Sequence, residues 1–531
     1  MEVKTEKSAT ATSGHEKPLA DDVGIAAIAE VGEVEDFTAE EEKAVRWKID
    51  LHLMPLLMIT YLVQFLDKSS ISYSALWGMR QDVGLHGTQY SWLTTIFYIG
   101  YLVAEFPMNA LFQKLNITRV CGVIIGLWGT VLLCMAACND FPSLMATRFF
   151  LGALESGVSP CFVLLTAMFY KRSEQPLRTA MWFSMNGMSQ IIGGLIAYGI
   201  GYIDSALPAW KFPFIIFGSL TVAWSLAFFL LAAPNPLQAA WLTPHERAVA
   251  VARLASNNTG LDSRVFKPHQ AREALLDARV WLLFLFTIAS NVPNGGITAF
   301  GALIVEGFGY STLGTALLNM PVGGAQVAAL WLSGWAAGVF PRARVPLMVG
   351  GILVALVGTV LMYAVPEERR LGRLFGYYLL PGFSATYVLS LGMIQANVAG
   401  RTKRGVVTAA LFVAYCVGNL VGPQLFFAWE APHYRSGFVA MIVCFVAQVV
   451  ILGAYWVVCR RENRKVRGVR SRCAFLWDRF LLIRCVMLKR DREYGQLGQD
   501  AGREQIEQGL SDLTDVRAPS LFLLFMFADL L

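Results

Sequence analysis

The chain has 531 residues, of which 55% are hydrophobic and only 15% are charged. About a quarter of the residues in a soluble domain are charged, so this composition excludes a row of soluble domains and predicts one large membrane-embedded body. The formal net charge of +6 resides in short polar loops and does not indicate nucleic-acid binding.

A polar segment precedes the first apolar run. Residues 1–46 include the acidic stretch EVEDFTAEEE and contain no apolar stretch of the signal-peptide type. We therefore predict a disordered amino-terminal tail over these residues.

Twelve apolar stretches follow, each long enough for a helix that crosses a hydrocarbon core of about 30 Å. They occupy residues 51–73, 89–110, 118–138, 142–169, 179–202, 212–233, 280–302, 312–336, 345–365, 373–396, 405–429 and 436–459. The layout predicts an all-α integral membrane protein with two pseudo-symmetric six-helix bundles, and such proteins bind their substrate between the bundles near the midplane. The predicted units are a first bundle over 47–233, a central connection over 234–279, a second bundle over 280–459, and an atypical, disordered tail over 460–531.

The Lys and Arg residues of the loops predict which side of the membrane the termini face. If the amino terminus is cytoplasmic, the loops on that side hold sixteen of these residues and the loops on the other side hold six. The cluster of Arg369, Arg370 and Arg373 is the main exception. We therefore expect both tails and the central connection to be cytoplasmic.

Five ionisable side chains lie inside the predicted spans of the first bundle: Asp67, Lys68, Glu105, Arg148 and Glu155. Each charge costs on the order of 2.5–3.5 kcal/mol near the centre of a membrane helix. Such groups must face one another or a hydrated cavity, so each of them is a candidate functional residue.

The fourth span carries Arg148 and Glu155 on one face, about 10.5 Å apart along the helix axis, which is too far for a direct salt bridge. We expect Asp67 to meet Arg148 across the bundle, which leaves Glu155 as the carboxylate without an obvious cation. A carboxyl that gains and loses a proton near the midplane is what proton coupling requires, while Lys68 and Arg148 would offer a binding site to an anion. The alternative for Asp67 and Arg148 is an ion pair that only locks helices together.

The seventh span contains SNVPNGG at residues 290–296. Because Pro293 removes a backbone donor and Gly295 and Gly296 loosen a helix, we expect this span to be broken here. Broken helices point to binding sites in transporters, so Asn291 and Asn294 are candidate substrate contacts. The alternative is a kink that serves packing.

Two weaker signals complete the candidate set. Glu105 lies near the cytoplasmic end of the second span with Lys114 and Arg119 close in sequence, and we expect a structural or gating ion pair there. Tyr98 and Tyr387 are candidate substrate contacts, although a tyrosine in a span is more often a core or interface residue.

Five stretches of the chain carry a resemblance to a known family. They are FLDKSSISYSALWGMRQDVGL (65–85), QYSWLTTIFYIGYLVAEFPMNALFQKL (89–115), RFFLGALESGVSP (148–160), WLTPHERAVAVARL (241–254) and NVPNGGITAFGALIVEGFGYSTLGTALLNMPVG (291–323). With them, over about residues 43–465, the chain resembles the major facilitator superfamily and within it the fungal allantoate permease family of anion:cation symporters. Members of that family move small organic anions such as allantoate, nicotinate and pantothenate, generally with protons.

The resemblance implies that Asp67 and Glu155 carry protons and that Lys68 and Arg148 bind the carboxylate. Two departures limit it. The loop FQKLNITR lacks the acidic, glycine-rich signature of the wider superfamily, and the segment after about Arg467 interrupts the basic tail that the family would continue.

The sequence therefore predicts a proton-coupled importer of a small carboxylate that works by alternating access. We expect a monomer in the plasma membrane whose partners are the anion, protons and lipid, with no cofactor, no metal and no enzymatic activity. The first alternative is an exporter of a pathway metabolite on the same fold. The second is a nutrient sensor that does not transport.

Overall fold

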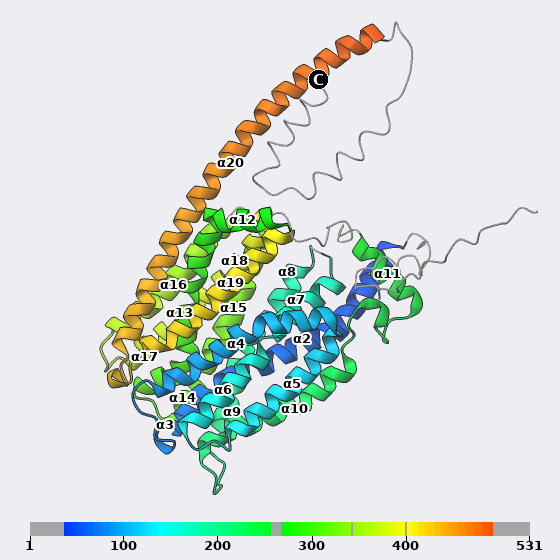
Figure 1. The fold of residues 1–531 in the computed structure, drawn as a ribbon. Helices are drawn as coiled ribbons and strands as arrows, with labels where there is room; N and C mark the ends of the chain where they lie inside the picture. Colours follow the sequence, from blue (N-terminus) through cyan, green and yellow to red (C-terminus); the bar gives the residue numbers. More distant parts are fainter. Residues whose placement is uncertain (1–36, 172, 256–266, 341–342, 399–400, 492–531) are drawn as a thin grey trace, which may run out of the picture.

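The computed structural model describes residues 37–171, 173–255, 267–340, 343–398 and 401–491. Within these ranges the regular elements are helices and no strand occurs (Figure 1). The first bundle contains α2 (Ala39–Leu76), α3 (Met79–Asp82), α4 (Gln89–Lys114), α5 (Ile117–Met135), α6 (Phe141–Glu155), α7 (Val158–Phe169), α8 (Gln175–Phe183), α9 (Met185–Ile200), η1 (Ala209–Lys211) and α10 (Phe212–Leu231). The connection contains η2 (Pro236–Gln238), α11 (Pro244–Ala255) and α12 (Pro268–Leu276). The second bundle contains α13 (Ala278–Gly307), α14 (Thr312–Leu318), α15 (Met320–Val339), α16 (Arg344–Ala364), α17 (Arg370–Leu379), α18 (Gly382–Asn397), α19 (Arg401–Val421), η4 (Gly422–Leu425), η5 (Ala428–Glu430) and α20 (Arg435–Asp491).

Membrane-spanning segments account for most of these helices. In the described residues, eleven helices or consecutive helix pairs are long and apolar enough to cross a membrane, and they coincide with eleven of the twelve predicted stretches. The remaining stretch, 179–202, coincides with α8 and α9, which adjoin at Ser184 and have 9 and 16 residues. A span needs about 20 residues, so only the two together have the required length.

The first helix begins earlier than the sequence predicts. A capping box starts it at Ala39, because Thr38 Oγ1 accepts a hydrogen bond from Glu41 N at 3.2 Å and Glu41 Oε2 accepts one from Thr38 N at 2.8 Å. The prediction of a disordered tail is therefore wrong for residues 39–46. Residues 1–36 lie outside the described residues.

The central connection contains two helices that are held by different bundles. In α11, Glu246 Oε2 lies 2.7 Å from Lys48 Nζ of α2, and this ammonium holds the pKa of Glu246 below its usual value. Lys403 of α19 contacts Glu273 Oε1 of α12 at 3.3 Å and Asp277 Oδ2 just before α13 at 3.1 Å. Each helix of the connection is therefore ion-paired with its own bundle.

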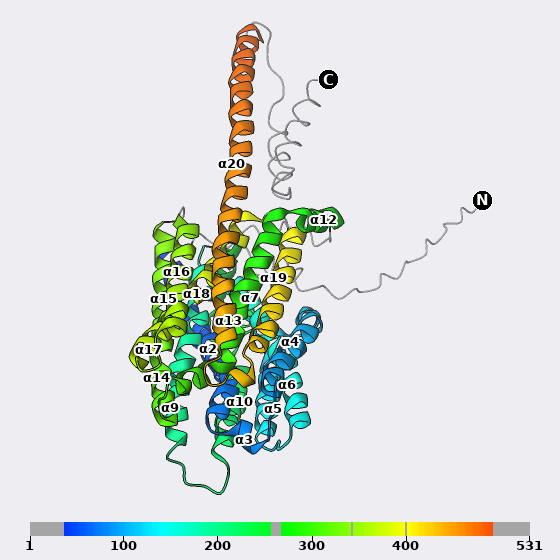
Figure 2. The same cartoon turned by 90° about the vertical axis from the view of Figure 1, so that its left-hand side faces the viewer.

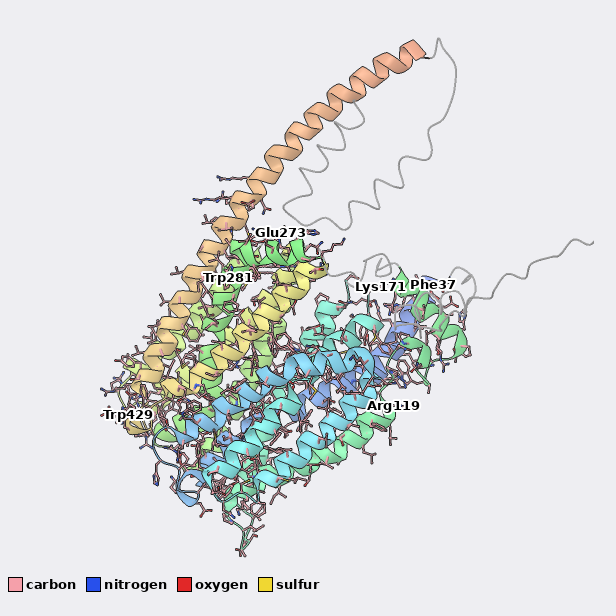
Figure 3. All side chains as sticks on the ribbon, in the orientation of Figure 1. Phe37, Arg119, Lys171, Glu273, Trp281 and Trp429 are labelled. Atoms are coloured by element: carbon pink, nitrogen blue, oxygen red, sulfur yellow. The ribbon has the colours of Figure 1, made fainter. Side chains whose placement is uncertain are left out.

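The two bundles touch at one end and diverge at the other (Figure 1). The diverging ends carry α11 on the first bundle and α12 on the second, and Figure 3 shows Lys171 and Glu273 on these separate ends. Because α2 runs from α11 toward α3, the touching end is opposite to the connection. There Tyr90 Oη of α4 donates to Ala299 O of α13 at 2.6 Å and Thr95 Oγ1 donates to Leu420 O of α19 at 3.1 Å.

Close approach of α9 to α14 strengthens the closed end. A Cβ built on Gly194 of α9 would lie only 2.7 Å from Ala316 O of α14, so these helices meet where a side chain is absent. The molecule is therefore in a state that is sealed opposite the connection.

Helix α13 is continuous from Ala278 to Gly307 and contains Pro293, so the predicted break is wrong. Proline at position 293 leaves the carbonyl of Ala289 without its helical donor. Gln448 Nε2 of α20 donates to Ala289 O at 3.0 Å and replaces the missing bond. Gly295 serves packing, since a Cβ there would lie 2.7 Å from Asn419 O.

Replacing Gln448 with leucine should therefore destabilise the protein. We expect Gln448→Leu to lower the free energy of unfolding by about 1–3 kcal/mol, because Ala289 O would be buried without a donor. Thermal unfolding of the purified protein in detergent measures the change. Ser290→Ala is the matched control, since the Ser290 hydroxyl is buried and has no hydrogen-bond partner among the described residues. Equal melting temperatures for Gln448→Leu and the unaltered protein would contradict this account.

The last helix is longer than predicted. Helix α20 continues from Arg435 to Asp491, and Figures 1 and 2 show it extending past the ends of the other helices. Its candidate span ends at Arg464. The prediction of a disordered tail is thus wrong for residues 460–491, while residues 492–531 lie outside the described residues.

Candidate functional site

Four of the five predicted intramembrane charges lie together in the first bundle and are shielded from solvent. Lys68 is 8% exposed, Arg148 is 2% exposed, and Asp67 and Glu155 are fully buried. Lys68 Nζ of α2 lies 3.6 Å from Glu155 Oε2 at the end of α6. Glu155 therefore has a cation, which corrects the prediction that it lacks one.

Asp67 points to a different part of the bundle. Its Oδ2 accepts hydrogen bonds from Trp128 Nε1 of α5 and from Thr221 Oγ1 of α10, the latter at 3.1 Å. In the described residues no ion pair joins Asp67 to Arg148, so the predicted contact is wrong. Consecutive residues of a helix are turned by about 100°, so Asp67 and Lys68 must face different neighbours.

Aromatic rings surround the Lys68 ammonium. Its Nζ lies 5.3 Å from the ring centroid of Phe65, 5.8 Å from that of Phe97 and 5.4 Å from that of Tyr101. Cation–π attraction of this kind is worth about 2 kcal/mol or more when the cation is desolvated. These rings hold the ammonium between α2 and α4 without supplying a second anion.

Among the described residues, Arg148 is a buried cation without an anionic partner. Its guanidinium lies 6.0 Å from the Phe214 ring, and Nε and Nη2 have no hydrogen-bond partner in the described residues. A buried charge that loses its partner costs about 3–5 kcal/mol, so an anion at this position would be strongly favoured.

A small cavity connects the two cations. Its volume is about 10 Å³, which is room for about one water molecule. Its lining includes Lys68, Thr94, Phe97, Tyr98, Arg148 and Thr298. Thr94 Oγ1 is also buried, and no described residue forms a hydrogen bond with it. Both bundles contribute to the lining, because Thr298 belongs to α13.

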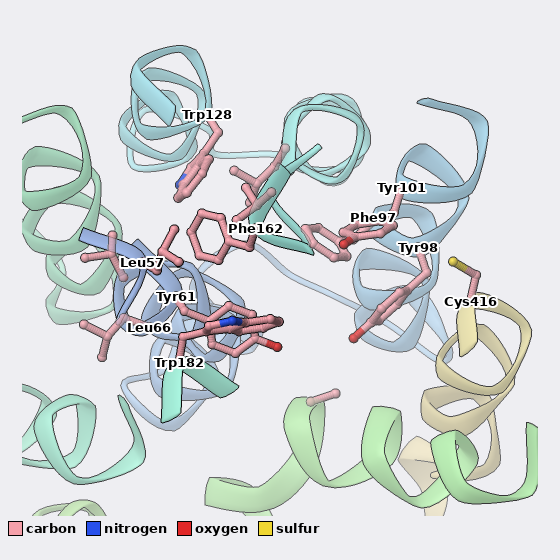
Figure 4. Packing of buried hydrophobic residues seen from close by; sticks show 14 of the residues in the cluster. Leu57, Tyr61, Leu66, Phe97, Tyr98, Tyr101, Trp128, Phe162, Trp182 and Cys416 are labelled. Carbon is pink, nitrogen blue, oxygen red and sulfur yellow. The ribbon is translucent and has the colours of Figure 1, made fainter. Parts of the chain in front are cut away.

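A chain of aromatic contacts crosses from one bundle to the other and back. The ring centroids of neighbours lie 6.2 Å apart for Tyr98 and Tyr415, 6.1 Å for Tyr415 and Tyr387, 6.4 Å for Tyr387 and Phe183, and 5.6 Å for Phe183 and Tyr61. Figure 4 shows Tyr61 and Tyr98 with their hydroxyls turned toward the space between them. Of the two predicted tyrosines, Tyr98 lines the cavity. Tyr387 does not line it, but contacts Tyr415, which in turn contacts Tyr98.

The asparagines of α13 form a separate polar network. Asn294 Nδ2 donates to Asn419 Oδ1 of α19 at 2.9 Å, and Asn419 Nδ2 donates to Asn291 Oδ1 at 3.2 Å. Neither Asn291 nor Asn294 is among the residues that line the cavity. Thr298, one turn further along α13, and its neighbour Ala299 line the cavity instead.

Glu105 does not form the predicted ion pair. Lys114 and Arg119 are exposed at the ends of their helices, and Figure 3 shows Arg119 at the periphery of the first bundle. In the described residues Glu105 accepts a single hydrogen bond, from Asn109 Nδ2 to Oε1 at 3.3 Å, and has no cation within 4.0 Å. The expected gating pair is therefore wrong.

The interruption expected in the seventh span occurs in the fourth. Helix α6 ends at Glu155 and α7 begins at Val158. Gln64 Nε2 of α2 donates to the main-chain oxygen of Glu155 at 3.3 Å. The signal that the sequence offered was Ser156-Gly157 followed by Pro160.

Comparison with known proteins gives consistent results along most of the chain. Residues 57–423 match the family profile described as Major Facilitator Superfamily. An uncharacterized transporter of Schizosaccharomyces pombe is 40% identical over 432 residues, which cover 81% of this chain and 82% of that protein. The allantoate permease of Saccharomyces cerevisiae is 37% identical over 453 residues, which cover 82% and 83%. A thiamine pathway transporter of the same yeast is 33% identical over 430 residues, which cover 79% and 80%.

Two solved structures share the arrangement of helices. A bacterial homologue of the human lysosomal transporter Spinster, inward-facing and unoccupied, gives a TM-score of 0.58 at 16% identity and covers 80% of this chain and 98% of that one. A D-xylose–proton symporter gives a TM-score of 0.58 at 14% identity and covers 76% and 97%. At such low sequence identity these structures show a similarity of fold alone.

Proposed function

Since the chain belongs to the major facilitator superfamily, in the group of fungal transporters that includes the yeast allantoate permease, we propose that it carries a small carboxylate into the cell together with a proton. One observation carries this proposal. Arg148 is a buried arginine that has no anionic partner in the part of the chain that the structure describes. It lines the same cavity as Lys68, which is paired with the carboxyl of Glu155. Two cations and one titratable partner suit an anion and a proton better than a neutral or cationic cargo.

Charge balance explains why the two cargoes would move together. When Asp67, Lys68, Arg148 and Glu155 are all ionised, their charges cancel. Protonation of Glu155 would break its ion pair with Lys68 and leave a net charge of +1, which a carboxylate neutralises. Binding of the proton without the carboxylate, or of the carboxylate without the proton, leaves an uncompensated buried charge, at a cost of about 3–5 kcal/mol. The empty state and the fully loaded state are therefore the two that can rearrange.

Alternating access would move the site between the two sides of the membrane. We place both termini and the connection in the cytoplasm of a monomer in the plasma membrane. The state described above, sealed opposite the connection, is then the one that releases cargo inward. The hydrogen bonds from Tyr90 to Ala299 and from Thr95 to Leu420 must break before the outer side opens.

The uncharged residues of the cavity have two roles in this proposal. Tyr98, Thr94 and Thr298 would contact the carboxylate or its substituent, because they line the space between the cations. Asn291 and Asn294 would act indirectly, since their side chains hold α13 against α19 through Asn419.

A panel of radiolabelled acids tests the proposal. Cells that express the full chain receive labelled allantoate, nicotinate and pantothenate at acidic external pH, with and without a protonophore. We expect at least one acid to accumulate above its external concentration and the protonophore to abolish this accumulation. Accumulation of no acid, or accumulation that the protonophore leaves intact, would refute proton-driven anion uptake.

Asp67 is the second carboxyl that we propose for proton coupling. It would hold the same single proton at another step of the cycle, and its substitution should have a distinct effect. Because Asp67 faces α5 and α10 instead of the cavity, Asp67→Asn should keep the apparent affinity for the carboxylate within about twofold and reduce uphill accumulation. The asparagine can still accept the hydrogen bonds of Trp128 and Thr221. Initial uptake rates at varied substrate concentration give the affinity, and steady-state uptake gives the accumulation. Loss of carboxylate affinity would instead place Asp67 in the binding site.

A further inference from the structure

Glu105 of α4 is a buried carboxyl that the mechanism above does not use. It is 7% exposed. In the described residues it accepts one hydrogen bond, from Asn109, and its Oε2 has no partner. A carboxylate inside a membrane span is costly unless it is paired with a cation or is neutralised by a proton. Glu105 is therefore a place at which a proton can be held and released.

The position of Glu105 relates it to the ion pair of the cavity. Glu105 follows Tyr101 by four residues, which places it about 6 Å further along α4. Since α4 runs from the closed end toward the diverging end, this step leads away from the seal. Tyr101 in turn lies 5.4 Å from Lys68 Nζ, which lies 3.6 Å from Glu155. Glu105 is thus beyond the ion pair, on the side of the connection.

Helix α19 of the second bundle covers this stretch of α4. The rings of Tyr101 and Phe412 stack with centroids 5.4 Å apart, so Glu105 follows directly after a contact between the bundles. This contact persists although the bundles diverge on this side, so Glu105 becomes exposed when they separate further and the stack of Tyr101 and Phe412 opens.

The other titratable groups around Glu105 are few. Tyr101 on its own helix and Cys416 on α19 interact with its charge. Beyond Tyr101 lie Lys68 of α2 and its partner Glu155 of α6. In the described residues no cation lies within 4.0 Å of the Glu105 carboxyl, so a transferred proton is the means of neutralising it.

We propose that Glu105 is a second proton-holding carboxyl, which receives the transported proton from Glu155 and releases it toward the cytoplasm. This inference rests on the proposed function. The O–H bond of Glu155 breaks, its carboxylate regains the ion pair with Lys68, and the proton passes through water beside Tyr101 to form an O–H bond on Glu105. Further separation of the bundles on this side then exposes Glu105, which gives the proton to cytoplasmic water. No electrons are transferred. The substrate anion also leaves for the cytoplasm, so one anion and one proton are released in each cycle.

The dependence of uptake on cytoplasmic pH tests this relay. Cells that express the full chain, with the cytoplasmic pH clamped by an ionophore, take up the acid of the panel that the unaltered protein accumulates best. For Glu105→Gln we expect net uptake to fall at least about fivefold and to lose its dependence on cytoplasmic pH. Exchange of labelled for unlabelled acid at equal pH should stay within about twofold of the unaltered protein, because exchange needs no proton release.

Two further variants separate the relay from a structural role. Asn109→Ala removes only the hydrogen bond to Glu105 and keeps the carboxyl, so its dependence on cytoplasmic pH should match that of the unaltered protein. Glu105→Asp should also retain that dependence. Net uptake by Glu105→Gln with an unaltered dependence on cytoplasmic pH would overturn the inference. If the unaltered protein accumulates no acid in response to pH, the proposed function itself fails.

Discussion

Replacing Glu155 by glutamine is expected to abolish uphill uptake of the carboxylate and to preserve its exchange across the membrane. Glutamine resembles the protonated form of Glu155, because it is neutral and leaves Lys68 free for the anion. The variant would therefore bind and move the carboxylate without a proton. A gradient of one pH unit supplies about 1.4 kcal/mol, or about tenfold accumulation, to a transporter that couples one proton to each anion. We expect this ratio to fall to about one in Glu155→Gln.

Steady-state accumulation and counterflow exchange measured in the same cells separate the two activities. Glu155→Asp is the matched control, since it keeps a carboxyl near Lys68 and should keep pH-driven accumulation at a lower rate. Because one proton and one carboxylate carry no net charge, accumulation by the unaltered protein should also be insensitive to membrane potential. If Glu155→Gln still concentrates the acid in response to a pH gradient, the proton is carried elsewhere.

The sequence predicted the membrane spans well because the length and apolar composition of a span are local properties. Eleven of the twelve predicted stretches are single helices or helix pairs with the length and composition of a span. The twelfth is divided at Ser184, which no rule based on apolar length detects. The early start of α2 was detectable, since Thr38 and Glu41 form the Thr-x-x-Glu pattern of a capping box.

The sequence predicted the charged members of the site and gave their pairing wrongly. The free-energy cost of a charge inside the membrane identifies Lys68, Arg148 and Glu155 as residues that must face one another or a hydrated cavity. Which carboxyl meets which cation depends on the direction of each side chain. Asp67 and Lys68 are adjacent in sequence, but their side chains contact different helices. Sequence spacing contains no information about the helix on the other side of the contact.

Apart from Tyr98, the uncharged members of the site gave no signal in the sequence. Thr94, Thr298 and Tyr415 occur in apolar spans where threonine and tyrosine are ordinary core residues. They are recognised only because the fold brings them to one cavity or one aromatic chain. The same is true of Gln448, whose donor to Ala289 O keeps α13 continuous through Pro293.

Replacing Arg148 by alanine is expected to remove carboxylate binding almost completely. Truncation of one member of a buried hydrogen-bonded charge pair costs about 2–5 kcal/mol, so the apparent Km of the acid should rise by at least about 30-fold. The uncharged amide of the same acid should lose much less affinity, because a guanidinium adds little to the binding of a neutral group. Uptake rates of the acid and inhibition by its amide measure the two effects.

A second measurement distinguishes loss of binding from loss of folding in this variant. Nε and Nη2 of Arg148 have no hydrogen-bond partner in the described residues, so alanine removes a buried charge and breaks no hydrogen bond of these atoms. Arg148→Ala should then melt at the same temperature as the unaltered protein or higher. Arg148→Lys restores the charge without the two-pronged geometry that a carboxylate prefers, so it should recover only part of the affinity. Full carboxylate affinity in Arg148→Ala would mean that the buried guanidinium serves packing, and the anion would then have to bind at Lys68 alone.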